Sequence, residues 1–222
     1  MRYEIVKPGA YPVLEVTLAA QERLVAEAGA MSWMSPGMKM ETSMRGGVVS
    51  SLKRKALGGE SLFQNTFSTT GGAATVGLVP GQPGEVVVLE LTGRDLFLER
   101  GAYIASTPEV QLDAKFQGLK GLFSEGLFVL RAFGKGLLFF AAYGSVDEID
   151  VDGEYIVDNG YAVAWESSLS YSVTRARKIR SFLFGDQLLL VFRGRGKVWA
   201  QCRSAVSFAN WVHPFRPVKS KS

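Results

Sequence analysis

Short apolar runs bounded by turn-forming residues follow one another along most of the chain. Clear examples are PVLEVTL at 12–18, EVVVLELTG at 85–93 and LLLVFRG at 188–194. Runs of this length, rich in leucine and β-branched residues, are typical of β-strands. Helical periodicity is scarce, and the clearest short helix is predicted over SSLKRKAL at 50–57, with Gly58 placed to end it. The pattern predicts an all-β protein.

Three patterns recur three times in the same order. A first strand pattern occurs in VLEVTLAAQERL (13–24), VVLELTGRDLF (87–97) and VDEIDVDGEYI (146–156). A strand leading into a turn with an acid or amide beside a glycine follows in LVAEAGAMSWM (24–34), LFLERGAYIAS (96–106) and YIVDNGYAVAW (155–165). We expect Gly29, Gly101 and Gly160 to occupy equivalent turns. A strand, a glycine-bearing turn and a second strand then predict a β-hairpin over 61–78, 126–143 and 187–202.

This recurrence predicts three tandem β repeats with a pseudo-threefold arrangement. Their boundaries fall at about 1–83, 84–144 and 145–216, and each unit is short for an independent domain. We therefore expect one compact body over 1–216 with a shared core. The basic tail 217–222 is expected to be disordered.

The composition indicates a globular protein but does not indicate a particular ligand. The chain has 222 residues, 47% of them hydrophobic and 21% charged, which is ample for a packed core. The formal charge of +4 permits an anionic partner but does not demand one. Cys202 is the single cysteine, so no internal disulfide forms. No apolar run approaches the length of a membrane-spanning helix, and we expect a cytoplasmic protein. If the functional hypothesis of membrane binding holds, we expect the protein at the periphery of a membrane.

The three connectors within the predicted units all mix basic and apolar residues. They are SSLKRKALGGESLF (50–63), KFQGLKGLFSEGLF (115–128) and RARKIRSFLFGDQL (175–188). Two interpretations stay open: solvated loops, or one face where cations meet lipid phosphates and apolar side chains insert. The candidate anion- or membrane-binding residues are Lys53, Arg54, Lys55, Lys115, Lys120, Arg175, Arg177, Lys178 and Arg180.

The sequence contains few residues of the types that usually form catalytic, nucleotide-binding or metal-binding sites. The segment ALGGESL has Glu60 where a phosphate-binding loop needs lysine, and no dinucleotide fingerprint follows a strand. His213 is the only histidine and Cys202 the only thiol, so neither a zinc site nor a catalytic triad is favoured. The sequence therefore predicts no catalytic, cofactor-binding or metal-binding residue, no cofactor, and a non-enzymatic role.

Three other groups of residues have a structural and a functional interpretation. Turn capping is favoured over acid–base chemistry for the recurring carboxylates Glu27, Glu99 and Asp158. Burial in strands is favoured over base stacking for Trp33 and Trp165.

Apart from Met1, all methionines lie between 31 and 44, and Met38, Met40 and Met44 would share one face of a strand. Such an adaptable apolar face fits a core edge or an interface better than a Cu(I) site. Because exposed strands are usually covered, we expect a homo-oligomer, with this face as the candidate interface.

Several segments resemble one known family. They include EAGAM, METSMRGG, LKRKALGGESLFQNTF, LERGAYIAS, VDNGYAVAWE and FLFGDQLLLVFRGRGKVWAQCRS. These residues are similar to the family named for altered inheritance of mitochondria, the twenty-fourth of that series, from about Pro12 to Ser204. The resemblance implies a TRAP-like fold, after the tryptophan RNA-binding attenuation protein, with β-sandwich or double-stranded β-helix-like repeats. It brings no catalytic motif, and its fungal member is associated with organisation of the mitochondrial inner membrane.

Three functional hypotheses follow. The first is a binding or scaffold protein that acts at anionic membrane surfaces or on partner proteins. The second is an RNA-binding module. The positive charge and the distant fold kinship favour it, whereas the aliphatic residues between the basic ones disfavour it. The third is small-molecule binding or catalysis in a pocket that the sequence does not reveal.

Overall fold

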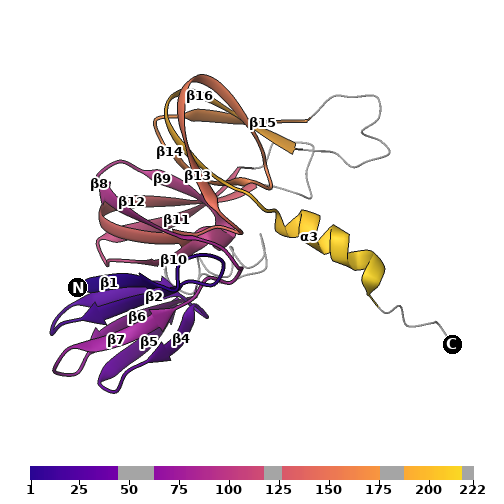
Figure 1. Cartoon of the computed structure of the whole chain (residues 1–222). Helices are drawn as coiled ribbons and strands as arrows, with labels where there is room; N and C mark the ends of the chain where they lie inside the picture. The colour runs from indigo at the N-terminus through magenta and orange to yellow at the C-terminus, as the bar shows by residue number, and fades with distance from the viewer. Residues whose placement is uncertain (45–62, 118–126, 176–187, 217–222) are drawn as a thin grey trace.

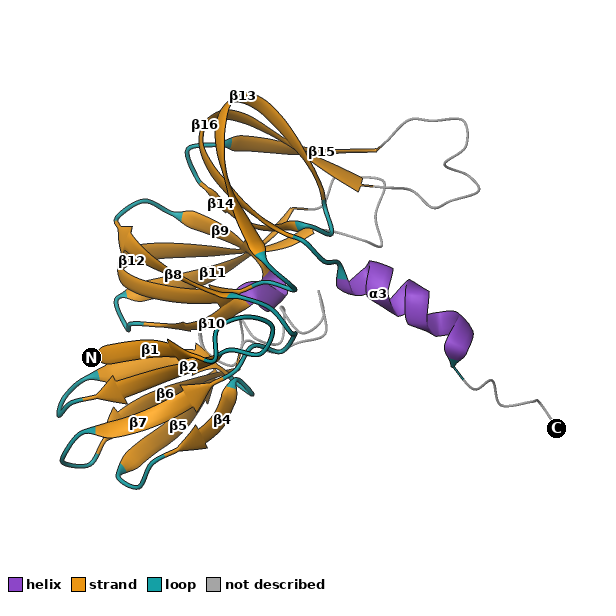
Figure 2. Cartoon of the chain, viewed as in Figure 1, coloured by secondary structure: helices purple, strands orange, loops and turns teal. Residues whose placement is uncertain are grey.

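Strands make up most of the structure, and the prediction of an all-β protein is confirmed (Figure 2). The computed structural model describes residues 1–44, 63–117, 127–175 and 188–216. The strands lie in three groups stacked one above another, with the N-terminus in the lowest group (Figure 1). The helix predicted over 50–57 and the tail 217–222 lie outside the described residues.

The elements follow one another in chain order through these three groups. The first contains β1 (Arg2–Val6), β2 (Val13–Leu18), β3 (Arg23–Glu27), β4 (Met31–Met34), β5 (Met38–Met44), β6 (Phe63–Thr69) and β7 (Ala74–Leu78). The second contains β8 (Val86–Thr92), β9 (Leu96–Glu99), the 3-10 helix η1 (Arg100–Ala102), β10 (Tyr103–Ser106), β11 (Val110–Gln117) and β12 (Leu127–Ala141). The third contains β13 (Val146–Asp158), β14 (Ala162–Glu166), β15 (Ser170–Arg175) and β16 (Leu188–Gln201), followed by α3 (Ala205–Val212) and the 3-10 helix η2 (His213–Phe215).

Two sheets organise the described strands. One has the order β1-β2-β7-β4, and the other runs β13-β16-β14-β9-β12-β10-β3-β6-β5, with β8, β11 and β15 attached beside β12 and β16. Alternation along β2 shows why these segments fold as strands: Leu14, Val16 and Leu18 are all fully buried, and the residues between them are partly exposed. Successive side chains of a strand point to opposite faces, so this alternation gives β2 one core face.

The three predicted hairpins over 61–78, 126–143 and 187–202 are wrong. In the second and third groups these segments are the single long strands β12 and β16, and in the first they are β6 and β7, which pair with different neighbours. In β12 and β16 the glycines bend the strand instead of reversing it. Gly194 of β16 has a φ of +120° and stands opposite Gly153 of β13, whose φ is +108°. Only glycine adopts such values at low cost, and paired glycines let both strands bend together.

Neighbouring groups are joined by antiparallel strand pairs. The strand β10 pairs with β3 of the first group, and β14 pairs with β9 of the second. The buried side chains form three clusters that cross the same junctions: the first includes Ile104 and Phe139 of the second group, and the second includes Trp199 of the third. Shared burial of this kind couples the groups to one another.

Candidate functional site

The basic connectors singled out by the sequence lie mostly outside the described residues. This applies to Lys53, Arg54, Lys55, Lys120, Arg177, Lys178 and Arg180. The two others are at strand ends, where Lys115 stands opposite Val129 and Arg175 stands opposite Leu188. A common anion-binding face for the connectors therefore stays a prediction.

The methionine strand is divided between core and surface. Met38 is only 7% exposed and packs in the first core cluster, so it offers nothing to a partner, a correction to its place in the candidate interface. Met40 is 38% exposed on β5, which forms the last strand of its sheet among the described residues. Met44 ends the same strand opposite Phe63. Met40 thus remains a candidate contact residue at a strand edge.

The two strand tryptophans have different environments. Trp165 is 1% exposed and contacts Phe97, Tyr171 and Phe192, which confirms the interpretation as a buried aromatic. For Trp33 that interpretation is wrong, because its side chain is 40% exposed. Its ring lies over Gly77, where an added Cβ would stand only 2.3 Å from Trp33 Cε2. Glycine at position 77 thus makes room for a tryptophan at the surface.

The recurring carboxylates Glu99 and Asp158 hold their turns, as predicted. Gly101 N donates to Glu99 Oε2 at 2.9 Å, and Gly160 N donates to Asp158 Oδ1 at 2.9 Å. At the third turn, Ala30 N donates to the backbone oxygen of Glu27, and Gly29 has a φ of +104°. The two side-chain bonds give Glu99 and Asp158 a structural role in ordering the backbone.

The three turns line one pocket with a volume of about 320 Å³. Glu27, Glu99 and Asn159 contribute to its wall, and α3 closes one side through Ala205 and Val206. Much of the polar lining already has partners: Gln201 Nε2 donates to Gly160 O at 3.0 Å, and Gln201 Oε1 accepts from Tyr143 N at 2.8 Å. Asn159 Oδ1, in contrast, is buried without a hydrogen-bond partner in the described part of the chain.

Two strand edges at opposite ends of the stack have no partner among the described residues. The strand β4 pairs with β7 alone and lies in the lowest group, whereas β13 pairs with β16 alone and lies in the highest (Figure 1). Both strands expose large apolar side chains: Trp33 and Met34 are 40% and 42% exposed on β4, and Tyr155 and Ile156 are 42% and 53% exposed on β13. Open apolar edges of this kind are templates for pairing with another chain.

The helix α3 and its exposed apolar residues were not predicted from the sequence. Ser204 is the N-cap, and its Oγ accepts from Ser207 N at 3.4 Å. No residue of α3 is buried, and Phe208 and Trp211 are more than half exposed. The available signal was Ser204 directly before AVSFANWV, since serine is a favoured N-cap residue.

Cys202, the single cysteine of the sequence, is exposed and lies between β16 and α3. Hydrogen bonding from Ser145, whose backbone N lies 3.2 Å from Cys202 Sγ, lowers the pKa of this thiol below its ordinary value. No group of three His, Cys, Asp or Glu side chains in the described residues could hold a metal ion. No described helix combines the length and apolar character needed to cross a membrane.

The chain is similar to two proteins of Streptococcus pyogenes. An uncharacterized protein of Streptococcus pyogenes serotype M6 is 28% identical over 99% of this chain and 93% of its own length. The crystal structure of a Streptococcus pyogenes protein, determined by structural genomics, is similar with a TM-score of 0.81 and 27% identity, covering 97% of this chain and 99% of that one. The family model described as Mitochondrial biogenesis AIM24 matches residues 3–203, and the chain therefore belongs to the AIM24 family.

Proposed function

We propose that this protein is a non-enzymatic scaffold that works as an assembly of identical chains joined head to tail, with β4 of one copy paired to β13 of the next. The observation that carries the proposal is the pair of unpartnered, apolar strand edges at opposite ends of one molecule. Binding of anionic surfaces or partner proteins is the role we expect of such a scaffold, because many weak contacts add up when copies are linked.

The strand pairs inside the chain supply the template for this contact. The strands β4, β10 and β14 each follow one of the three glycine turns, and each shifts register after its first residue, at Met31/Trp33, Tyr103/Ala105 and Ala162/Ala164. On their other edges β10 pairs with β3 and β14 pairs with β9. We infer that the three groups are repeats. The free edges of β4 and of the end of β13 correspond to the two strands that pair at each internal junction, so they can form the same kind of junction between two chains.

The equivalence also predicts the register between chains. At the internal junctions Ala105 stands opposite Ala26 and Ala164 opposite Leu98, each partner lying one residue before a turn carboxylate. The corresponding pair between chains is Trp33 opposite Val157, which places Met34 opposite Ile156. At the second internal junction the matching pair is Trp165 and Phe97, whose ring centroids are 6.0 Å apart.

The exposed side chains fit this register. Met34 and Ile156 are 42% and 53% exposed in the single chain, although both are large and apolar. Cross-strand apolar pairs are a main source of sheet stability, so bringing these two together stabilises the contact. Because the contact joins two different surfaces, repetition produces a closed ring if the rotation closes and a filament if it does not.

A second candidate function is binding of a small polar molecule in the turn pocket. It is favoured by Asn159 Oδ1, which is buried and has no hydrogen-bond partner among the described residues. A ligand with a hydrogen-bond donor would satisfy this oxygen. Native mass spectrometry of the freshly purified protein tests it, and Asn159→Ala should release any bound mass.

Disulfide trapping between two different chains tests the scaffold proposal. One chain carries Met34→Cys and the other Ile156→Cys, both in a Cys202→Ser background that removes the exposed native thiol. Mixing the two chains under mild oxidation should give a covalent heterodimer, because residues directly opposite in neighbouring strands have Cβ atoms close enough for a disulfide.

The matched control replaces Ile156→Cys by Tyr155→Cys, which lies one residue away and points to the other face of β13. The proposal predicts trapping with position 156 and little with position 155. Equal trapping at both positions, or none at either, contradicts the proposed pairing.

A further inference from the structure

We propose that α3 and η2 form a membrane-contact element that inserts its aromatic side chains into the interface of an anionic lipid bilayer. The aromatic strip consists of Phe208, Trp211 and Phe215. The inference goes beyond the scaffold proposal and does not depend on it, because the strip is complete within one chain.

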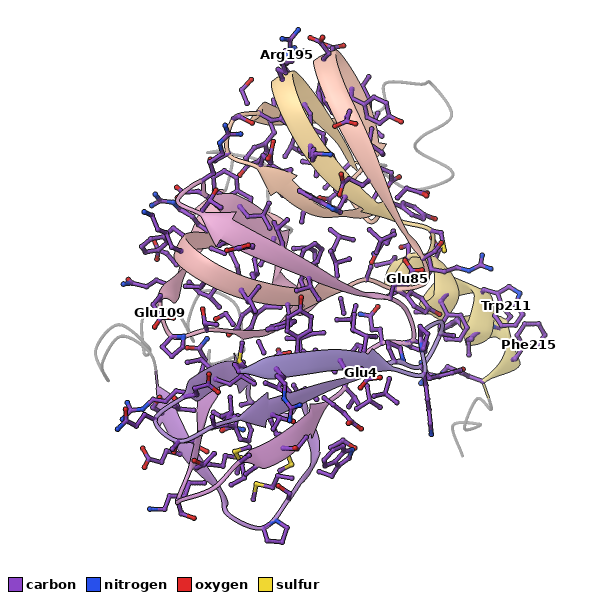
Figure 3. All side chains as sticks on the ribbon, turned by 60° about the vertical axis from the view of Figure 1, so that its left-hand side comes forward. Glu4, Glu85, Glu109, Arg195, Trp211 and Phe215 are labelled. Atoms are coloured by element: carbon purple, nitrogen blue, oxygen red, sulfur yellow. The ribbon has the colours of Figure 1, made fainter. Side chains whose placement is uncertain are left out.

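The element is apolar where nothing in the described structure covers it. Val206, Phe208, Trp211 and Phe215 are 68%, 51%, 66% and 74% exposed. In Figure 3, Trp211 and Phe215 project at the outer end of the helix, away from the strands. Contiguous exposed apolar side chains of this size mark an interaction surface, whereas single exposed residues carry no such meaning.

The three rings form a continuous strip. Phe208 and Trp211 have centroids 5.9 Å apart, and Trp211 and Phe215 are 5.8 Å apart. At its inner end Phe208 contacts Tyr143 of the body at 6.2 Å. Residues three and four apart lie on one side of a helix, so the strip faces outward as a unit. A helix of two turns is not stable alone in water, so its cap and this contact hold it in place.

The charge around the strip identifies the occupant. Residues 203–216 contain no Asp or Glu, and two arginines, Arg203 and Arg216, flank α3 and η2. A cationic apolar element is complementary to a surface with negative headgroups above hydrocarbon. Tryptophan in particular favours the boundary between headgroups and acyl chains.

RNA is the alternative anionic partner, and the positive charge alone does not distinguish RNA from an anionic bilayer. An aliphatic neighbour of the strip favours lipid. Val212 lies four residues after Phe208, on the same side of the helix, and is partly exposed. Such a side chain adds insertion into acyl chains but no stacking on bases. The structure therefore assigns the strip to a bilayer.

Vesicle co-sedimentation tests the assignment. The full chain is mixed with phosphatidylcholine vesicles that contain phosphatidylserine and with pure phosphatidylcholine vesicles. We expect binding to the anionic vesicles that salt weakens, and a loss of at least about tenfold in the variant Phe208→Ser/Trp211→Ser/Phe215→Ser. The matched control Tyr11→Ser removes an aromatic that is 76% exposed outside the element and should bind like the parent.

A second measurement does not depend on the folding of the triple variant. A polarity-sensitive dye on Phe215→Cys, in the Cys202→Ser chain, should shift its emission to the blue with anionic vesicles, because position 215 is the most exposed of the strip. The variant Ile156→Lys, which should weaken the contact between chains, should keep this shift. This result would show that lipid binding by the element does not require the scaffold contact. Absence of binding by the parent, equal binding by the triple variant, an unshifted dye, or tighter binding of a single-stranded RNA than of anionic vesicles would each overturn the inference.

Discussion

Ile156→Lys places a charge in the middle of the proposed contact between chains. The side chain is 53% exposed in the single chain, so lysine can point into water there without disturbing the core. In the assembly the same position stands opposite Met34, where a lysine would be enclosed by apolar groups. Lysine is also a residue with which natural sheets protect their open edges.

The size of the effect follows from the area still to be covered. Full burial of an isoleucine contributes about 1.5–3 kcal/mol, and with 53% of the side chain exposed about 0.8–1.6 kcal/mol remains to be gained on assembly. Losing that contribution weakens the dissociation constant by roughly four- to fifteenfold, and the cost of covering the ammonium group adds to it. The free energy of unfolding of the single chain should change by no more than about 0.5 kcal/mol.

Sedimentation velocity over a range of protein concentrations measures the change. The parent should form species larger than one chain, and Ile156→Lys should shift their onset to higher concentration. Tyr11→Lys is the control, since it replaces an exposed aromatic outside β4 and β13 by the same charge. A parent that stays monomeric at high concentration, or a variant that associates like the parent, refutes the reasoning.

Two further predictions concern single residues. Gly77→Ala should lower the free energy of unfolding by about 1–3 kcal/mol in urea, because the new Cβ meets the Trp33 ring at 2.3 Å, whereas Gly72→Ala, with no atom within 4 Å, should cause little change. Equal effects of the two variants would argue against the packing of Trp33 on Gly77. Cys202 should be alkylated at a lower pH than a free thiol, because its lowered pKa leaves more thiolate at neutral pH. The rate–pH profile measures this, and a midpoint at or above that of free cysteine would contradict it.

The sequence was most informative where burial alternates along a strand. In β2 the spacing of Leu14, Val16 and Leu18 is enough to predict both the strand and its buried face. The turn carboxylates Glu99 and Asp158 were also predictable, because an acid two residues before a turn glycine can accept from the glycine N–H.

Glycine misled the prediction of hairpins. A glycine inside an apolar run suits either a chain reversal or a bend within a continuing strand, and local sequence does not distinguish them. Gly153 and Gly194 stand opposite one another across two long strands, a relation set by residues some forty positions apart. Only the strand pairing shows that both positions are bends.

The exposed apolar residues were predictable as residue types but not as surfaces. Trp33 and Trp165 follow their turns at similar distances, yet one is 40% and the other 1% exposed. The two positions are not equivalent, because Trp33 corresponds in register to Ala164, and Trp165 corresponds to Met34. Trp165 is covered because β14 lies between β9 and β16, whereas Met34 is 42% exposed because β4 lies beside β7 alone among the described strands. A single sequence does not show which repeat is left at the end of a stack.

Hydrogen–deuterium exchange as a function of protein concentration tests the proposed head-to-tail contact most directly. Pairing of β4 with β13 engages backbone N–H groups on the open edges of both strands, so exchange within residues 33–34 and 155–158 should slow as the concentration rises. Ser35 N already donates to Thr75 O, so its exchange should not change. Exchange in the internal pair β9–β14 should stay constant and serves as the reference. Slowing confined to β4 and β13, and absent in Ile156→Lys, is the predicted result; exchange at both edges that is independent of concentration would contradict the account.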